Sequence, residues 1–144
     1  MPSENETIQF LSRVPLFKNL EKRQLESLAK VAHADHFKEG QEIVTQGEMG
    51  IGLFVIVSGA ATVVHNNPDG TTTVVNELKA TDFFGELALL SEGPRTASVV
   101  ATEETECLVI SRWEFRSLAK EDSEMALVVM EELAHRFRAV LTIL

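Results

Sequence analysis

The spacing of apolar residues divides the chain into three parts, of which the first is helical. Ser3 and Glu6 have the spacing of a capping box, which predicts a short helix ending near Arg13. Pro15 interrupts this helix, and Asn19 is a suitable N-cap for a second one. The second helix has apolar residues at helical spacing. They are Leu25, Leu28, Ala29 and Ala32.

The middle part consists of short runs rich in Val, Ile, Thr and Phe, broken by glycine and aspartate, which is typical of β-strands. Between two such runs, residues 67–70 read Asn-Pro-Asp-Gly. This sequence predicts a hairpin turn, because proline presets the turn and glycine accepts a positive φ. Many short strands with frequent turns favour a β-sandwich or a small barrel. We predict strands near 42–46, 53–57, 60–65, 71–78, 96–101 and 105–110.

The helical spacing returns after Ile110. Ser111 and Glu114 form a second capping-box spacing, and Asp122 or Ser123 is placed to cap a final helix. The apolar stripe of that helix is wider than one packing face needs, so we expect it to contact a ligand, a second subunit or another domain. The stripe comprises Ala126, Val129, Met130, Leu133, Phe137, Val140, Leu141 and Leu144.

The composition fits one globular domain. The chain has 144 residues, 44% of them apolar and 24% charged, and this length suffices to bury a core. No linker or repeat interrupts it, so we predict a single domain over residues 1–144. Its parts would be N-terminal helices (1–35), a β-roll (36–110) and C-terminal helices (111–144).

Charge and cysteine content exclude several classes of function. The net charge is −9 and the 13 basic residues form no stripe, which argues against a nucleic-acid partner. No apolar run approaches the roughly 20 residues of a membrane span, and the acidic start lacks the layout of a signal peptide. Cys107 is the only cysteine and lies in an apolar strand, so we expect a buried thiol and a cytoplasmic protein.

Residues 83–98 carry the candidate chemistry: Phe-Phe-Gly-Glu-Leu-Ala-Leu-Leu-Ser-Glu-Gly-Pro-Arg-Thr-Ala-Ser. Gly85 permits a tight turn or a close approach to a ligand, and residues 86–90 form one helical turn with free N–H groups. Arg95 would open the next strand, and its planar guanidinium suits a phosphodiester, while Glu86 suits a sugar hydroxyl. These residues alone leave an alternative open, in which Glu86 favours the helix dipole and simply pairs with Arg95.

This run resembles the phosphate-binding cassette of the cyclic nucleotide-binding domain family. The family pattern is approximately Phe-Gly-Glu-Leu-Ala-Leu, a short gap, then Pro-Arg-(Ala/Thr/Ser)-Ala, and every position is matched within 84–97. The segments 14–17 (Val-Pro-Leu-Phe) and 46–50 (Gln-Gly-Glu-Met-Gly) are similar to the family as well. The resemblance, to catabolite activators and to the regulatory regions of cAMP- and cGMP-dependent kinases, implies an antiparallel jelly roll of about eight strands with flanking helices.

The resemblance also implies roles for single residues. Glu86 would accept the ribose 2′-hydroxyl, and Arg95 would pair with the exocyclic phosphate oxygens beside neighbouring backbone N–H groups. Thr96 matches a cGMP-selecting position of kinases, but many bacterial members with Thr or Ser prefer cAMP, so cAMP is favoured and cGMP is the alternative. Val63 and Val75 would form walls, Arg136 would match an arginine of the last helix, and Val140 and Leu141 would form an apolar cap. The implied ligand-binding residues are Gly85, Glu86, Leu87, Ala88, Arg95, Thr96, Ala97, Val63, Val75, Arg136 and Val140.

The function implied is sensing without catalysis, in which ligand binding moves the last two helices. The C-terminal helix would contact a second copy or an effector chain. Two rivals remain. A non-binding interaction module of the same fold is disfavoured by the intact Glu86 and Arg95. A jelly-roll metalloenzyme would need a ligand cluster, and His33 and His36 lack a third ligand, so we expect no metal and no cofactor.

Overall fold

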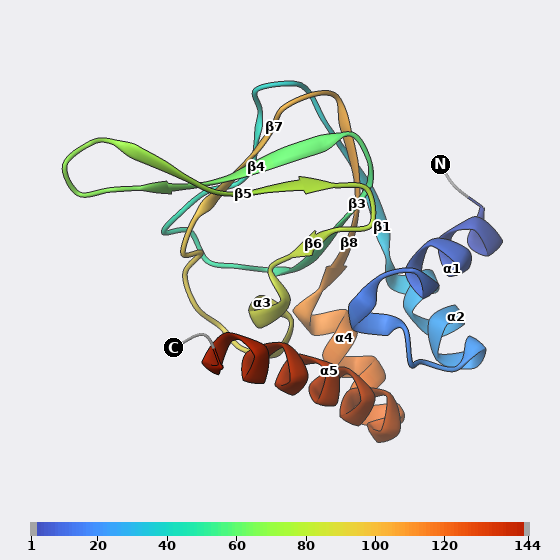
Figure 1. Ribbon diagram of the computed structural model, residues 1–144. Coiled ribbons are helices and arrows are strands. Elements are labelled where there is room, and N and C mark those ends of the chain that lie inside the picture. The colour runs from blue at the N-terminus through green and yellow to red at the C-terminus, as the bar shows by residue number, and fades with distance from the viewer. Residues whose placement is uncertain (1–2, 143–144) are drawn as a thin grey trace. The chain divides into compact units, whose positions relative to one another are not determined.

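The computed structural model describes residues 3–142, which form two compact units (Figure 1). One unit consists of residues 32–112 and contains all eight strands. The other consists of residues 3–31 and 113–142 and is helical. That residues 1–144 act as one domain stays a prediction.

The β unit has two four-stranded antiparallel sheets, so the jelly-roll prediction is confirmed (Figure 1). One sheet has the order β1-β8-β3-β6, and the other has the order β2-β7-β4-β5. The strands are β1 (His33–Phe37), β2 (Glu42–Val44), β3 (Gly52–Ser58), β4 (Ala60–Asn66), β5 (Thr72–Lys79), β6 (Phe83–Phe84), β7 (Ser98–Ala101) and β8 (Thr105–Ser111).

The core of the β unit is formed by buried apolar side chains from both sheets. Cys107 on β8 is fully buried, as expected, and burial raises the pKa of its thiol to about 12, with smaller effects from the carboxylates of Asp35 and Glu106. A thiol with that pKa stays protonated and inert at neutral pH. The buried members of the core cluster are Ile43, Phe54, Ile56, Ala61, Leu78, Phe84, Val99, Ala101, Cys107 and Val109.

Three strand predictions need correction. Strand β1 was not predicted, because its sequence His-Ala-Asp-His-Phe is mostly polar. It pairs with β8, so His33 and His36 lie on a strand. Nε2 of His36 lies 2.7 Å from Oε2 of Glu106. Strand β6 has only two residues, too few for a periodic signal. Strand β7 begins at Ser98, so Arg95 precedes the strand instead of opening it.

The hairpin of β4 and β5 projects from the rest of the β unit (Figure 1). Its predicted turn is confirmed: Asn67 N–H donates to the carbonyl of Thr71 at 2.8 Å, and Gly70 has a φ of 89°. A register shift between Val63 and Val64 interrupts the pairing of the two strands. Strand β5 lies at the edge of its sheet, and most of its side chains are exposed.

The helical unit contains α1 (Glu4–Ser12), the short 3-10 helix η1 (Pro15–Phe17), α2 (Lys22–Val31), most of α4 (Arg112–Glu121) and α5 (Ser123–Leu141). The capping box of Ser3 and Glu6 is present, as predicted. The prediction of Asn19 as an N-cap is wrong. Helix α2 begins at Lys22, because the chain first completes a turn after η1, and the carbonyl of Glu21 accepts the first helical hydrogen bonds.

Asp122 caps α5, which confirms one of the two predicted caps. Its carboxylate accepts from the N–H of Met125 at 3.1 Å and from Nη1 of Arg23 at 2.8 Å. These hydrogen bonds stabilise the ionised form and lower the pKa of Asp122. One side of α5 is buried at Met125 and Val129. The helix also carries exposed large apolar side chains, namely Leu127, Met130, Phe137, Val140 and Leu141.

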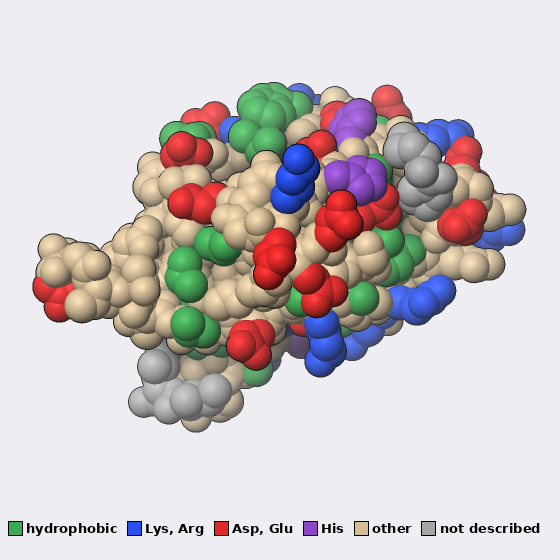
Figure 2. Space-filling model, turned by 90° about the horizontal axis from the view of Figure 1, so that it is seen from above, with side chains coloured by type: hydrophobic (Ala, Val, Ile, Leu, Met, Phe, Trp, Pro, Cys, Tyr) green, Lys and Arg blue, Asp and Glu red, His purple; other side chains and the backbone are tan. Residues whose placement is uncertain are grey.

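Surface charge and helix composition relate to two classes that the sequence argued against, namely nucleic-acid-binding and membrane-spanning proteins. On the face seen in Figure 2, Lys and Arg side chains are scattered among acidic ones and form no continuous basic patch. Within residues 3–142, none of the helices has the length and apolar character required to cross a membrane.

Candidate functional site

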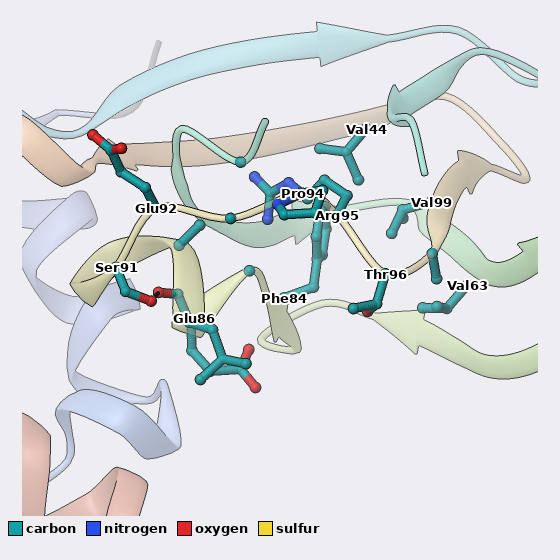
Figure 3. A pocket seen from close by; sticks show the side chains of 16 residues that line it. Val44, Val63, Phe84, Glu86, Ser91, Glu92, Pro94, Arg95, Thr96 and Val99 are labelled. Atoms are coloured by element: carbon teal, nitrogen blue, oxygen red, sulfur yellow. Dashed lines mark hydrogen bonds between the residues drawn. The ribbon is translucent and has the colours of Figure 1, made fainter. Parts of the chain in front are cut away.

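A cavity of about 290 Å³ opens in the β unit beside the short helix α3 (Glu86–Leu90) (Figure 3). Its size is near the lower end of ligand pockets in general, roughly 300–1,000 Å³. The predicted cassette supplies most of its wall, with valines from three strands of one sheet closing the far side. The lining residues are Val44, Gly50, Val63, Phe84, Gly85, Glu86, Leu87, Ala88, Ser91, Glu92, Gly93, Pro94, Arg95, Thr96, Ala97 and Val99.

Gly85 is the N-cap of α3 and has a left-handed backbone conformation, at a φ of 83°. A Cβ at this position would overlap Nη1 of Arg95 and would lie 2.6 Å from the carbonyl oxygen of Gly52. Glycine is therefore needed here twice, for the positive φ and for the space that the guanidinium occupies. The positive φ agrees with the tight turn that the sequence predicted, whereas a close approach of Gly85 to a ligand stays a prediction.

Arg95 reaches into the cavity from a segment fixed by backbone hydrogen bonds. Its N–H donates to the carbonyl of Glu48 at 2.7 Å, and its carbonyl accepts from the N–H of Gly47 at 2.8 Å. A third bond joins the N–H of Gly50 to the carbonyl of Gly93 at 3.1 Å. Residues 93–95 thus form a ladder with residues 47–50, which positions the side chain of Arg95 before any ligand arrives.

The guanidinium of Arg95 is half-buried and only partly satisfied by the protein. In residues 3–142 its one hydrogen bond runs from Nη2 to the carbonyl of Gly52, at 3.1 Å. Its Cζ lies 5.6 Å from the ring centre of Phe54, a cation–π distance, and Phe54 stacks on Phe84 at 5.1 Å. Burial lowers the pKa of Arg95, and the nearby charge of Glu86 acts in the opposite direction. An arginine in this setting stays charged and has N–H groups to offer an anion.

Glu86 is the first residue of α3, where a carboxylate interacts favourably with the helix dipole. The described residues include no ion pair between Glu86 and Arg95, and in Figure 3 the carboxylate lies apart from the guanidinium. The structure therefore does not contain the simple Glu86–Arg95 ion pair that was the alternative. The two groups face the cavity separately, one as an acceptor and one as a donor.

The backbone N–H groups expected to assist Arg95 are partly engaged. The N–H of Ala88 donates to the carbonyl of Gly85 at 3.0 Å, closing the first turn of α3. The side chain of Leu87 is 72% exposed. Thr96 and Ala97 line the cavity just before β7 begins. A ligand at this site would therefore share or replace the bond of the Ala88 N–H.

The structure brings most of the predicted ligand-binding residues to one cavity. Those that line it are Gly85, Glu86, Leu87, Ala88, Arg95, Thr96, Ala97 and Val63. Val75, on β5, is 60% exposed and outside the lining. Arg136 and Val140 lie on α5, in the helical unit. The role of each of these residues toward a ligand stays a prediction.

Sequence reasoning missed several residues that shape the site. Phe54 and Phe84 support Arg95, and Gly50 leaves room for it, since a Cβ on Gly50 would lie 3.1 Å from Nε of Arg95. Arg112 is the first residue of α4, and it is 4% exposed. One signal could have singled it out: a charged residue stands between the apolar run 107–110 and the aromatic residues Trp113 and Phe115, where a buried ion needs partners.

Comparison with known proteins gives a consistent result. The model of the cyclic nucleotide-binding domain family matches residues 34–122. A cAMP-dependent protein kinase regulatory subunit from Mucor circinelloides f. lusitanicus is 38% identical over 109 residues, which are 76% of this chain and 25% of that protein. This chain thus spans about a quarter of the length of that curated relative.

Two solved structures are similar in both fold and sequence. One is the regulatory domain of Toxoplasma gondii PKA with cAMP, at a TM-score of 0.77 and 27% identity, covering 89% of this chain and 49% of that one. The other is the Thermus thermophilus catabolite activator protein, at a TM-score of 0.78 and 29% identity, covering 88% of this chain and 59% of that one.

Proposed function

This chain belongs to the cyclic nucleotide-binding domain family, and from that premise we propose that it is a cAMP-binding regulatory domain. The observation that carries the proposal is the guanidinium of Arg95, held in the cavity by Gly52 and Phe54 and with N–H groups left to donate. A half-buried arginine fixed in advance suits a phosphodiester, because its planar fork matches two phosphate oxygens without further ordering.

Glu86 and Val63 would contact the remainder of the ligand. The Glu86 carboxylate would accept a hydrogen bond from the ribose 2′-hydroxyl, consistent with its place in the lining apart from Arg95. Val63 would pack against the sugar or the base, and Val75, Arg136 and Val140 would join only if β5 and α5 approach the ligand. A cation and a separate acceptor suit the binding of a sugar phosphate, so we propose that the domain is not an enzyme.

The choice of cAMP over cGMP rests on family resemblance. The Mucor relative is named as a cAMP-dependent regulatory subunit, and the Toxoplasma domain was crystallised with cAMP. Thr96 lines the cavity and its hydroxyl could favour guanine. One hydroxyl contributes about 0.5–1.5 kcal/mol net, roughly a threefold to tenfold preference. The cGMP-selective domain therefore remains the second candidate.

We further propose that ligand binding moves the C-terminal helices, which act as the two-state element of the sensor. The exposed apolar side chains of α5 support this, because such a surface commonly contacts another chain. A second copy or an effector chain would be the partner. A single buried thiol is consistent with a reducing compartment, and we propose the cytoplasm.

Titration calorimetry with cAMP and cGMP tests the proposal directly. The native protein should bind both, with cAMP tighter. Arg95→Ala should lose about 30-fold to several thousandfold in affinity, because removing one partner of a desolvated charge pair costs about 2–5 kcal/mol. Arg116→Ala is the matched control, since Arg116 is an exposed arginine of α4 outside the cavity. The absence of binding heat with either nucleotide, or an Arg95→Ala protein that binds like the native one, would refute the proposal.

A further inference from the structure

Arg112 is a buried charge at the junction between the last strand and helix α4. Strand β8 ends at Ser111, and Arg112 is the first residue of α4. Its backbone N–H donates to the carbonyl of Ile51 at 2.8 Å, which holds this point of the chain against the segment before β3. A buried arginine needs acceptors around its guanidinium, so the partners of that group show what the residue holds together.

The guanidinium of Arg112 reaches the wall of the cavity from behind. Nη1 donates to two carbonyl oxygens, that of Gly50 at 3.1 Å and that of Ala88 at 3.3 Å. Nη2 lies 3.6 Å from a carboxylate oxygen of Glu92, whose side chain is 76% exposed. Both carbonyls and the carboxylate belong to residues that line the cavity. Arg112 itself is not among the lining residues, so it acts on the site only through them.

The two carbonyl partners lie in one tightly packed layer with Arg95. A Cβ on Gly50 would lie 2.8 Å from Cβ of Ala88 and 3.1 Å from Nε of Arg95. Helix α3 therefore rests directly on the backbone of Gly50, beside the side chain that would bind the phosphate. The Nη1 atom of Arg112 spans this contact, because it donates to one carbonyl on each side of it.

This arrangement makes α3 and the start of α4 hard to move separately. If α3 shifted away from Gly50 while Arg112 stayed in place, a buried N–H of the guanidinium would lose its acceptor, which is costly in a dry environment. A shift in which Arg112 follows Ala88 keeps that bond, but it carries the first residue of α4 along. The ionic contact with Glu92 is exposed and screened, so it contributes less than the carbonyl bonds.

We propose that Arg112 is the positioning residue that joins α3 to α4, so that a ligand at α3 changes the first turn of α4 through this one side chain. This inference rests on the proposed function, because it presupposes that a cyclic nucleotide binds beside α3. It adds the residue and the bonds through which binding would reach the C-terminal helices.

Trp113 supplies the readout, because it is the only tryptophan in the chain and directly follows Arg112. In the native protein, saturating cAMP should change the Trp113 emission with the same midpoint as the calorimetric titration. Arg112→Lys keeps the charge but lacks the planar fork, so we expect the emission change to fall by about half or more while cAMP affinity falls only about threefold to tenfold. Arg13→Lys is the matched control, since Arg13 is an exposed arginine outside the cavity, and it should keep the native emission change.

The outcomes separate this inference from the proposed function. Without binding heat in the native protein, the proposed function fails. If Arg112→Lys binds cAMP and shows the full native emission change, or if native binding leaves the emission unchanged, the positioning role is refuted.

A purely structural arginine predicts a different result. Arg112→Lys would then lower thermal stability but keep the full emission change in the fraction that binds. If this variant does not fold, hydrogen exchange of the native protein distinguishes a positioning role of Arg112 from a purely structural one. Residues 86–90 and 112–116 should change protection together when cAMP is added, and a change confined to 86–90 would overturn the proposal.

Discussion

The two walls of the cavity differ in how they are held and in what they offer a ligand. The cassette wall, residues 85–97, supplies Arg95 and Glu86, and its backbone is bonded to residues 47–50. The hairpin wall, strands β4 and β5, contributes only Val63 among the described residues that line the cavity. Its edge strand is mostly exposed and its register shifts beside Val63.

The contrast between the two walls indicates which part of a ligand the domain recognises most selectively. A fixed cation and a separate carboxylate select a phosphate and a hydroxyl by charge and geometry. A single aliphatic side chain, Val63, selects little beyond apolar character, because dispersion and burial are not directional. We therefore expect affinity to depend mainly on the cassette wall and the choice of base to depend weakly on the hairpin wall.

The largest expected effect on cAMP affinity comes from Gly85→Ala, which disturbs the cassette wall without removing a charge. The added Cβ would overlap Nη1 of Arg95, so the guanidinium must leave its position. We expect cAMP affinity to fall by about 30-fold or more, as for loss of the charge itself. Titration calorimetry measures this.

Gly70→Ala is the control for that substitution. Gly70 has a φ of 89°, close to the 83° of Gly85, but a Cβ there would meet nothing within 4 Å. Gly70→Ala should lose about 1–2 kcal/mol of unfolding free energy from the left-handed backbone. Gly85→Ala should lose more, because its Cβ would also lie 2.6 Å from the carbonyl oxygen of Gly52, and only this variant should lose affinity. Equal affinities for the two variants would show that the space around Arg95 is unimportant for binding.

A smaller effect is expected from Glu86→Gln, which keeps the shape of the side chain and removes its charge. A hydrogen bond to a charged group contributes about 1.5–3 kcal/mol, against about 0.5–1.5 for a neutral one, so cAMP should bind about tenfold more weakly. With 2′-deoxy-cAMP, the native protein and the variant should bind alike. If the substitution weakens both ligands equally, Glu86 does not act on the 2′-hydroxyl.

The smallest effect belongs to the hairpin wall, where Val63 and Val75 form a matched pair. Val63 lines the cavity and Val75 is 60% exposed outside it. Val63→Ala should weaken cAMP binding by about fivefold, since removing a partly buried apolar group costs about 1 kcal/mol. Val75→Ala should stay within about twofold. If Val75→Ala lost more than twofold in cAMP affinity, β5 would close over the bound ligand, and the hairpin wall would contribute more to binding than expected here.

Predictions succeeded where a local sequence dictates its own hydrogen bonds. The turn at 67–70 and the capping box of Ser3 and Glu6 formed as expected, because a few neighbouring residues supply every donor and acceptor involved. The predicted N-cap at Asn19 was wrong because another local hydrogen-bonded turn took its place. The chain completes a turn after η1, so α2 begins only at Lys22.

The missed features depend on partners far away in the chain. Strand β1 is polar and gives no alternating signal, and it exists because β8 pairs with it some 70 residues later. Phe54 reads as an ordinary core residue, yet its ring lies against Arg95. Arg112 matches no motif, and its acceptors at Gly50 and Ala88 come from two other segments.

The order of residues along the chain is enough to identify the family, the cassette and its residues Glu86 and Arg95, because the matched residue types lie in one continuous segment. That Arg95 and Glu86 face one cavity without pairing, and that Gly85 makes room for the guanidinium, follows from the tertiary structure alone. The tertiary structure also decided that Arg112 bonds to the cassette from behind. Such relations are distances between remote segments, and they are set by how the two sheets and α3 pack, which no single stretch of sequence encodes.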